Sequence, residues 1–400
     1  MDRRSNPYAP GAGLQPPELA GRGPLIDDAS IDMDRVLAGR PAKGLMLLGL
    51  RGVGKTVLLN RLRALADEKG FCSIRVEAPE GGNLPELLTP QLRQTLYALD
   101  LRKAATHNLH RAASVFANFA KAFKVKTGDL EFSVDFAPGE GDAGNLEQDL
   151  PHLLVTTARA AAERQTAVGL FIDEVQYLSS QELAAVIVAC HEVAQENLPF
   201  LFIGAGLPQV AALAGKAKSY AERLFDYPNV GSLEPDDARC ALVKPAQAEG
   251  ASYEHGAVEE ILAAAQNFPY FIQEWGYQVW NAAPSSPITR EMVRAATPQV
   301  VEHLDSSFFR VRFDRLTPLE QKYLRAMAEL GPGPRATGKI AQTLGVASAS
   351  IATVRQRLVA KGMIWSQRHG ETSFTAPMFD AYMKRQMPEL LQHVPQPRGR

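Results

Sequence analysis

The stretch GLRGVGKT, residues 49–56, follows an apolar run at 45–48 and precedes an amphipathic segment at 56–69. This pattern predicts a buried strand, a glycine-rich loop and a helix. Glycines let such a loop curl until its backbone N–H groups face phosphate oxygens, and the helix N-terminus adds positive potential. We therefore expect a nucleotide phosphate site formed by Gly49, Leu50, Arg51, Gly52, Val53, Gly54, Lys55 and Thr56.

A second stretch, VGLFIDE at 168–174, is an apolar strand that ends in two acids. The carboxyl ends of such strands are where open α/β sheets bind ligands. Asp173 can hold Mg²⁺ together with the Thr56 hydroxyl, and Glu174 can orient and deprotonate an attacking water. With Lys55 reaching the β- and γ-phosphates, these residues predict Mg²⁺-dependent hydrolysis of a nucleoside triphosphate, with Lys55 and Glu174 as catalytic groups.

Strands alternate with helices over the first half of the chain, which predicts an α/β fold with a mainly parallel sheet covered on both faces. The expected strands lie at 45–48, 73–78, 168–172 and 199–203. Alternating residues around Gly128 predict a β-hairpin near 123–138, either a partner-binding element or a plain exposed insertion. From about residue 234 the pattern becomes helical, with segments at 238–249, 257–265 and 270–283.

The last part of the chain predicts three helices followed by a strand, a turn and a strand, the order of a winged helix. Residues 310–400 hold fifteen Lys and Arg against six Asp and Glu, although the whole chain has a net charge of -1. Arg355, Arg357 and Lys361 on the third helix and Arg368 in the wing are candidates for contacts with duplex DNA. A winged helix used for protein contact is the alternative.

The stretches 49–56 and 171–174 resemble the Walker A and Walker B motifs of AAA+ ATPases, and the helical segment after the sheet resembles their lid. A closer resemblance is to the bacterial and archaeal AAA-type ATPases related to the initiator (origin-recognition-like) and STAND groups, over about residues 17–390. ELAGR, 18–22, is similar to their adenine-side motif, and NFPYFIQEWG, 267–276, to a segment of their lid. The resemblance implies ATP and Mg²⁺ as ligands and adds Arg22 and Pro269 to the nucleotide-binding residues.

Two departures from that family pattern predict slow turnover. The strand after the acids runs into GAGLP, 204–208, without the polar side chain usual there, and FPY, 268–270, stands in place of a sensor arginine. One missing polar group near a transferring phosphate can cost about 10²–10³ in rate. Arg223 is a candidate arginine finger that would act on a neighbouring subunit, and an ordinary surface arginine is the alternative.

These patterns predict a P-loop AAA ATPase core at 1–235 with an N-terminal adenine-side segment, a helical lid at 236–305 and a winged helix-turn-helix at 310–390. The expected function is an ATP-dependent switch that contacts DNA or a protein partner. A non-catalytic ATP-bound adaptor and an oligomeric DNA-processing motor or loader are the alternatives, and self-association is left open. Three widely spaced cysteines and the lack of an apolar run of about 18–20 residues favour a cytoplasmic protein without membrane contact.

Overall fold

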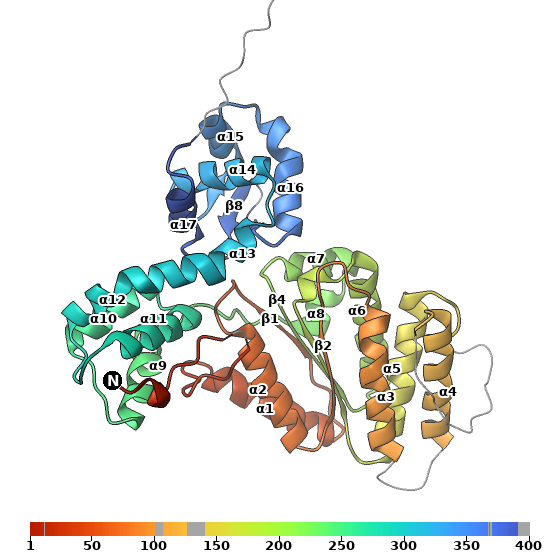
Figure 1. Ribbon diagram of the computed structural model, residues 1–400. Helices are drawn as coiled ribbons and strands as arrows, with labels where there is room; N and C mark the ends of the chain where they lie inside the picture. Colours follow the sequence, from red (N-terminus) through yellow and green to blue (C-terminus); the bar gives the residue numbers. More distant parts are fainter. Residues whose placement is uncertain (12, 101–106, 126–140, 367, 369, 391–400) are drawn as a thin grey trace, which may run out of the picture. The chain divides into compact units, whose positions relative to one another are not determined.

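The computed structural model describes residues 1–11, 13–100, 107–125, 141–366, 368 and 370–390 (Figure 1). They divide into two compact units. The first comprises Met1–Gly21, Leu50–Gly54 and Gly231–Arg400, and the second comprises Arg22–Gly49 and Lys55–Val230. The hairpin expected around Gly128 lies outside the described residues.

The second unit is built on a parallel five-stranded sheet with the order β2-β3-β4-β1-β5. Its strands are β1 (Gly44–Leu48), β2 (Cys72–Glu77), β3 (Val168–Asp173), β4 (Phe200–Gly206) and β5 (Phe225–Asp226). Every residue of β1, β3 and β4 is buried, which accounts for their apolar character, interrupted by Asp173 at the end of β3. Parallel pairing brings the carboxyl ends of these three strands to one edge, with β4 between β1 and β3. The predicted α/β fold class is confirmed.

Helices cover both faces of this sheet. In Figure 1, α1 and α2 lie on one side of the strands, and α5 and α6 lie on the other, with α3 and α4 beside them. The short elements α7, α8 and β5 were not predicted, because two to eight residues are too few to show a period. The helices are α1 (Gly23–Leu37), α2 (Lys55–Glu68), α3 (Leu84–Asp100), α4 (His107–Ala122), α5 (Leu146–Glu163), α6 (Ser180–Gln195), α7 (Val210–Ala217) and α8 (Ala221–Leu224).

The first unit contains four helices over the region predicted to be the lid, and we call them the lid helices: α9 (Pro235–Ala248), α10 (His255–Ala265), α11 (Pro269–Ala282) and α12 (Arg290–His303). The N-terminal residues pack onto these helices, whereas the sequence pattern predicts that they belong to the ATPase core. Tyr8 is 3% exposed, and its hydroxyl donates to the carbonyl of Leu242 at 2.6 Å. A Cβ at Gly276 would lie 2.6 Å from the Tyr8 ring, so the glycine makes room for the aromatic side chain.

A π-helical turn (Leu304–Phe309) and α13 (Arg310–Phe313) lead from the lid into the C-terminal elements. The longest helix there, α14 (Pro318–Glu329), begins after its cap Thr317, which forms a capping box with Glu320. Three short strands form an antiparallel sheet in the order β6-β8-β7. The remaining elements are β6 (Arg335–Ala336), α15 (Thr337–Leu344), a 3₁₀ turn (Ser348–Ile351), α16 (Ala352–Ala360), β7 (Ile364–Trp365), β8 (Glu371–Phe374) and α17 (Phe379–Gln386).

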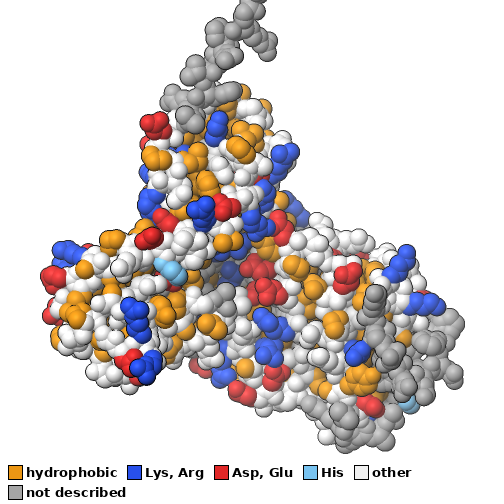
Figure 2. All heavy atoms as spheres, viewed as in Figure 1, with side chains coloured by type: hydrophobic (Ala, Val, Ile, Leu, Met, Phe, Trp, Pro, Cys, Tyr) orange, Lys and Arg blue, Asp and Glu red, His pale blue; other side chains and the backbone are white. Residues whose placement is uncertain are grey.

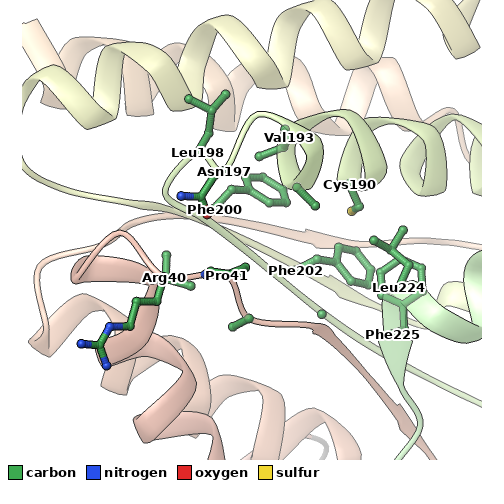
Figure 3. Close-up of a pocket in the computed structure, with 14 residues that line it drawn as sticks. Arg40, Pro41, Cys190, Val193, Asn197, Leu198, Phe200, Phe202, Leu224 and Phe225 are labelled. Atoms are coloured by element: carbon green, nitrogen blue, oxygen red, sulfur yellow. The ribbon is translucent and has the colours of Figure 1, made fainter.

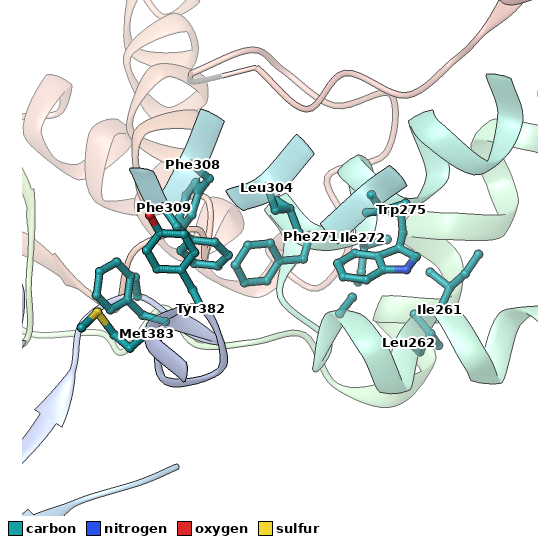
Figure 4. Packing of buried hydrophobic residues seen from close by; sticks show 14 of the residues in the cluster. Ile261, Leu262, Phe271, Ile272, Trp275, Leu304, Phe308, Phe309, Tyr382 and Met383 are labelled. Carbon is teal, nitrogen blue, oxygen red and sulfur yellow. The ribbon is translucent and has the colours of Figure 1, made fainter. Parts of the chain in front are cut away.

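The lid helices and the C-terminal elements share one apolar core (Figure 4). Phe271 of α11 packs edge-on against Phe308 of the π-helical turn, with ring centroids 5.4 Å apart. The adjacent Phe309 stacks on Tyr382 of α17 at 5.2 Å. Aromatic side chains therefore form a continuous chain of contacts from the lid to the last helix. None of the helices in the described ranges combines the length and apolar character needed to cross a bilayer.

Candidate nucleotide site

The strand, loop and helix predicted around residues 49–56 are all present. The loop leaves the carboxyl end of β1 and enters α2 at Lys55, whose side chain is 7% exposed. Gly52 and Gly54 have φ angles of 81° and 87°, in the left-handed region that favours glycine. These two glycines give the loop the curvature that turns backbone N–H groups toward a bound anion.

The Thr56 hydroxyl lies beside the Asp173 carboxylate at the carboxyl edge of the sheet, where hydrogen bonding to it lowers the pKa of that carboxylate. Asp173 is 1% exposed and also accepts a bond of 2.8 Å from the backbone N–H of Glu174. Burial raises the pKa of Asp173 above its ordinary value, and the nearby Lys55 and the hydrogen bond from Thr56 only partly offset this effect. A buried carboxylate beside a hydroxyl is an oxygen donor set suited to Mg²⁺, and a cation there would favour the charged form. These residues therefore fit the metal.

Glu174 follows β3 with its backbone in the left-handed region, at φ 53° and ψ 40°. Its carboxylate accepts a hydrogen bond from the side-chain amide of Gln176. The carbonyl oxygen of the same amide accepts a bond of 3.0 Å from the backbone N–H of Leu207, just after β4. Gln176 was not predicted as a site residue, because its role depends on β3 and β4 being neighbours.

Two backbone hydrogen bonds tie the loop Leu50–Gly54 to other parts of the first unit. The N–H of Tyr270 donates to the carbonyl of Gly52 at 3.1 Å, and the N–H of Arg51 donates to the carbonyl of Thr375 at 2.9 Å. The predicted nucleotide-binding residue Pro269 is the first residue of α11 and directly precedes Tyr270. The glycine loop therefore contacts both the lid and the C-terminal elements.

Two other predicted residues lie in the second unit. Arg22 is half-buried immediately before α1. Arg223 is exposed on α8, directly before β5, and Phe225 of β5 pairs with Gly44 at the amino end of β1. Arg223 is thus at the edge of the sheet opposite to its own glycine loop. A role as arginine finger requires a second copy of the chain.

A narrow cavity of about 40 Å³ lies at the amino ends of β1, β4 and β5 (Figure 3). Apolar side chains such as Phe200 and Phe202 line most of it, and Arg40 and Asn197 lie at its border. Its volume is that of one or two water molecules. The cavity is at the edge remote from Asp173 and is not the nucleotide site.

The basic side chains predicted to meet DNA fall into two groups. Arg355 donates to Thr372 Oγ1 at 3.2 Å and to Ser366, and Lys361 lies 2.8 Å from the buried carboxylate of Glu320. These two side chains therefore stabilise the fold of the C-terminal elements. Arg357 and Arg368 are exposed.

An open cleft of about 420 Å³ lies where α16 faces the segment between β7 and β8. Figure 2 shows Lys and Arg side chains along the edge of the C-terminal part on which α16 lies. The cleft combines positive charge with hydrogen-bonding groups, as a phosphate-binding surface does. Its polar lining consists of Thr337, Ser348, Arg355, Gln356, Ser366 and Arg368.

Comparison with known proteins agrees with this geometry. The fold is that of a P-loop AAA+ NTPase, and residues 18–203 match the family described as AAA ATPase domain. Residues 306–383 match a family described as a domain of unknown function (DUF8462). No curated protein matches the chain.

The solved structures that are similar to this one include the following three. The Walker-type ATPase PabY2304 of Pyrococcus abyssi is 16% identical, with a TM-score of 0.57 over 90% of this chain and 95% of that one. The Aeropyrum pernix Orc1 protein in complex with DNA is 17% identical, with a TM-score of 0.46 over 92% and 94% of the two chains. The Thermotoga maritima RuvB Holliday junction branch migration motor is 15% identical, with a TM-score of 0.43 over 96% and 100%.

Proposed function

We propose that this protein is an ATP-binding and slowly ATP-hydrolysing switch whose nucleotide state controls a contact made by a C-terminal winged helix. The observation that carries the proposal is the half-buried Thr56 beside the buried Asp173, which adjoins Glu174 at the edge of the sheet where the glycine loop begins. The AAA ATPase domain match over residues 18–203 supports the same reading.

The proposed reaction is in-line hydrolysis of the γ-phosphate. Lys55 and the N–H groups of the loop would hold the phosphates, and Thr56 and Asp173 would hold Mg²⁺, which would neutralise phosphate charge. Glu174 accepts a proton from water as the water oxygen bonds to the γ-phosphorus and the bond to the ADP oxygen breaks. Low turnover is expected because β4 ends in Gly204, Ala205 and Gly206, without a polar side chain of its own.

The contacts of the glycine loop support coupling between nucleotide and the C-terminal elements. Tyr270, bonded to Gly52, stacks on Phe308 with ring centroids 4.8 Å apart, and Phe309 stacks on Tyr382. A nucleotide that changes the conformation of the loop would therefore also alter the aromatic contacts in the core of the C-terminal elements. Such a ligand shifts the protein between two states only by its different affinity for each.

Duplex DNA is the proposed partner of the C-terminal elements. Three helices and an antiparallel three-stranded sheet are the parts of a winged helix, and α16 is the helix that would enter the major groove. Arg357 and Arg368 are exposed and are the proposed contacts, whereas Arg355 and Lys361 have partners within the protein. Three free cysteine thiols support a reducing, cytoplasmic location.

The test is steady-state ATP turnover by wild type and Glu174→Gln, each with and without duplex DNA. We expect slow turnover that DNA stimulates and that the variant loses, together with unchanged ATP binding. Tight ATP binding without turnover in any condition would instead favour a non-catalytic adaptor. Fast turnover confined to an assembled oligomer would favour a DNA-processing motor.

A further inference from the structure

We infer that Gln176 is a positioning residue for Glu174 and replaces the polar side chain that β4 lacks at its end. The inference rests on the proposed function, in which Glu174 accepts the proton of the attacking water. It concerns only residues of the second unit, and it explains how a strand that ends in Gly204, Ala205 and Gly206 can still serve a hydrolytic site.

The amide of Gln176 is held at both of its ends. The backbone N–H of Leu207 needs an acceptor, so the side-chain oxygen must face it, at 3.0 Å. This leaves the NH₂ group to face Glu174 Oε2, the acceptor that it contacts. The orientation of the amide is thus determined by the hydrogen bonds, and Glu174 is linked through one side chain to the end of β4.

The missing side chain at Gly206 makes this link sterically possible. A Cβ there would lie 2.8 Å from Gln176 Oε1 and 2.7 Å from Val210 Cγ2. A larger residue at this position would displace the Gln176 amide from Leu207. The glycine and the glutamine therefore form one arrangement, in which the polar group reaches the end of β4 from the segment after β3.

Gln176 is the side chain that hydrogen-bonds to the Glu174 carboxylate within the described residues, so this bond matters for the position of the carboxylate. The side chain of Glu174 is half-buried, and Glu174 follows a strand in the left-handed backbone conformation. A general base must be within hydrogen-bonding distance of the proton it takes, and a misplacement of about 1 Å can cost roughly 10²-fold in rate. An amide donor on one carboxylate oxygen leaves the other oxygen for water.

The experiment compares turnover and ATP binding in Gln176→Met, which keeps the length of the side chain but removes both hydrogen bonds. We expect kcat to fall about 10–100-fold while the Kd for ATP and the Tm stay close to those of wild type. Gly206→Ala should reproduce the fall in kcat from the other side of the contact. Gln181→Met, an exposed glutamine on α6, is the matched control and should behave as wild type.

The outcomes separate this inference from the proposed function. Turnover by wild type that Glu174→Gln abolishes, combined with wild-type kcat in Gln176→Met, would overturn the positioning role alone. Parallel losses of ATP affinity and Tm in Gln176→Met would also overturn it, because they indicate a merely structural role. Absence of turnover in wild type would contradict the proposed function itself.

Discussion

The backbone N–H of Tyr270 donates a hydrogen bond of 3.1 Å to the carbonyl of Gly52. The first turn of a lid helix is therefore bonded to the glycine loop at a residue whose backbone conformation favours glycine. The Tyr270 ring stacks on Phe308, in the turn that leads into the C-terminal elements. A change in the loop can thus reach those elements through a single residue.

Tyr270→Ala should uncouple the two ends of this contact chain. The backbone bond to Gly52 persists, but the stacking on Phe308 is lost, at a cost of about 1–3 kcal/mol in the free energy of unfolding. We expect ATP binding close to wild type and a smaller difference in DNA affinity between ATP and ADP, with the bond from Arg51 to Thr375 still in place. Fluorescence anisotropy with labelled duplex measures this difference. An undiminished nucleotide effect in the variant, with Tyr277→Ala as control, would refute this coupling route.

Asp173→Asn should change how stability depends on pH. Burial raises the pKa of Asp173 above 3.8, so the folded protein binds this proton more tightly than the unfolded chain. Protonated Asp173 therefore stabilises the folded protein. This stabilisation is fully present below the pKa that Asp173 has in the unfolded chain, and it is lost as pH rises through the pKa that Asp173 has in the folded protein. Without nucleotide and Mg²⁺, urea unfolding should therefore show the variant gaining stability relative to wild type as pH rises above 3.8 and through the raised folded pKa of Asp173. A difference in the free energy of unfolding between variant and wild type that does not change with pH would contradict the raised pKa of Asp173 as its cause.

Lys361→Met should destabilise the C-terminal elements. Burial alone would raise the pKa of Glu320, but the bonds from Lys361 and Thr317 outweigh it and lower the pKa. The variant leaves a buried carboxylate without its cation, which should cost roughly 2–4 kcal/mol at neutral pH. The wild-type advantage is present above pH 4.5, the ordinary pKa of glutamate, and should shrink as pH falls through the lowered folded pKa. Chemical unfolding of Lys361→Met and of Lys339→Met, an exposed control, measures this loss of stability. Equal stability of the two variants would contradict the prediction.

Arg357→Ala and Arg368→Ala should weaken DNA binding without affecting stability. Each exposed arginine that contacts a phosphate should lower the slope of log K against log salt by about 1. Binding titrations at several salt concentrations measure that slope. Lys384→Ala on α17 is the control, and a slope that stays at the wild-type value in both arginine variants would favour a protein partner instead.

Arg223→Ala tests whether turnover needs a second copy of the chain. Arg223 is exposed at the amino ends of the strands, away from its own loop. If it acts on a neighbour, the variant should lose turnover at high protein concentration, by about 10³-fold or more, with ATP affinity retained. Turnover equal to wild type across the whole concentration range would show that Arg223 is an ordinary surface residue.

The parts of the site that lie close together along the chain could be predicted from the sequence. The glycine loop and the acids after β3 each follow an apolar run, and the sheet register brings them to one edge because their strands are parallel. Gln176 could not be predicted, because its contact with Leu207 depends on which strand lies beside β3. The ion pair of Lys361 with Glu320 could not be predicted either, because Glu320 lies on another helix, far away in the sequence.

The N-terminal residues illustrate the same limit. Their composition predicts an extended segment, and no local pattern indicates that Tyr8 fills the space beside Gly276. That pairing depends on the shapes of side chains that are distant in the sequence. Packing of this kind appears only once the lid helices are assembled.

The π-helical turn Leu304–Phe309 has a consequence for cooperativity. Its two aromatic rings belong at once to the lid and to the C-terminal elements, so neither part has a complete core without the other. Cutting the chain at this turn would expose both rings to water. The lid and the C-terminal elements should therefore unfold together in one transition. Heat or mechanical force that unfolds one of them should unfold the other as well.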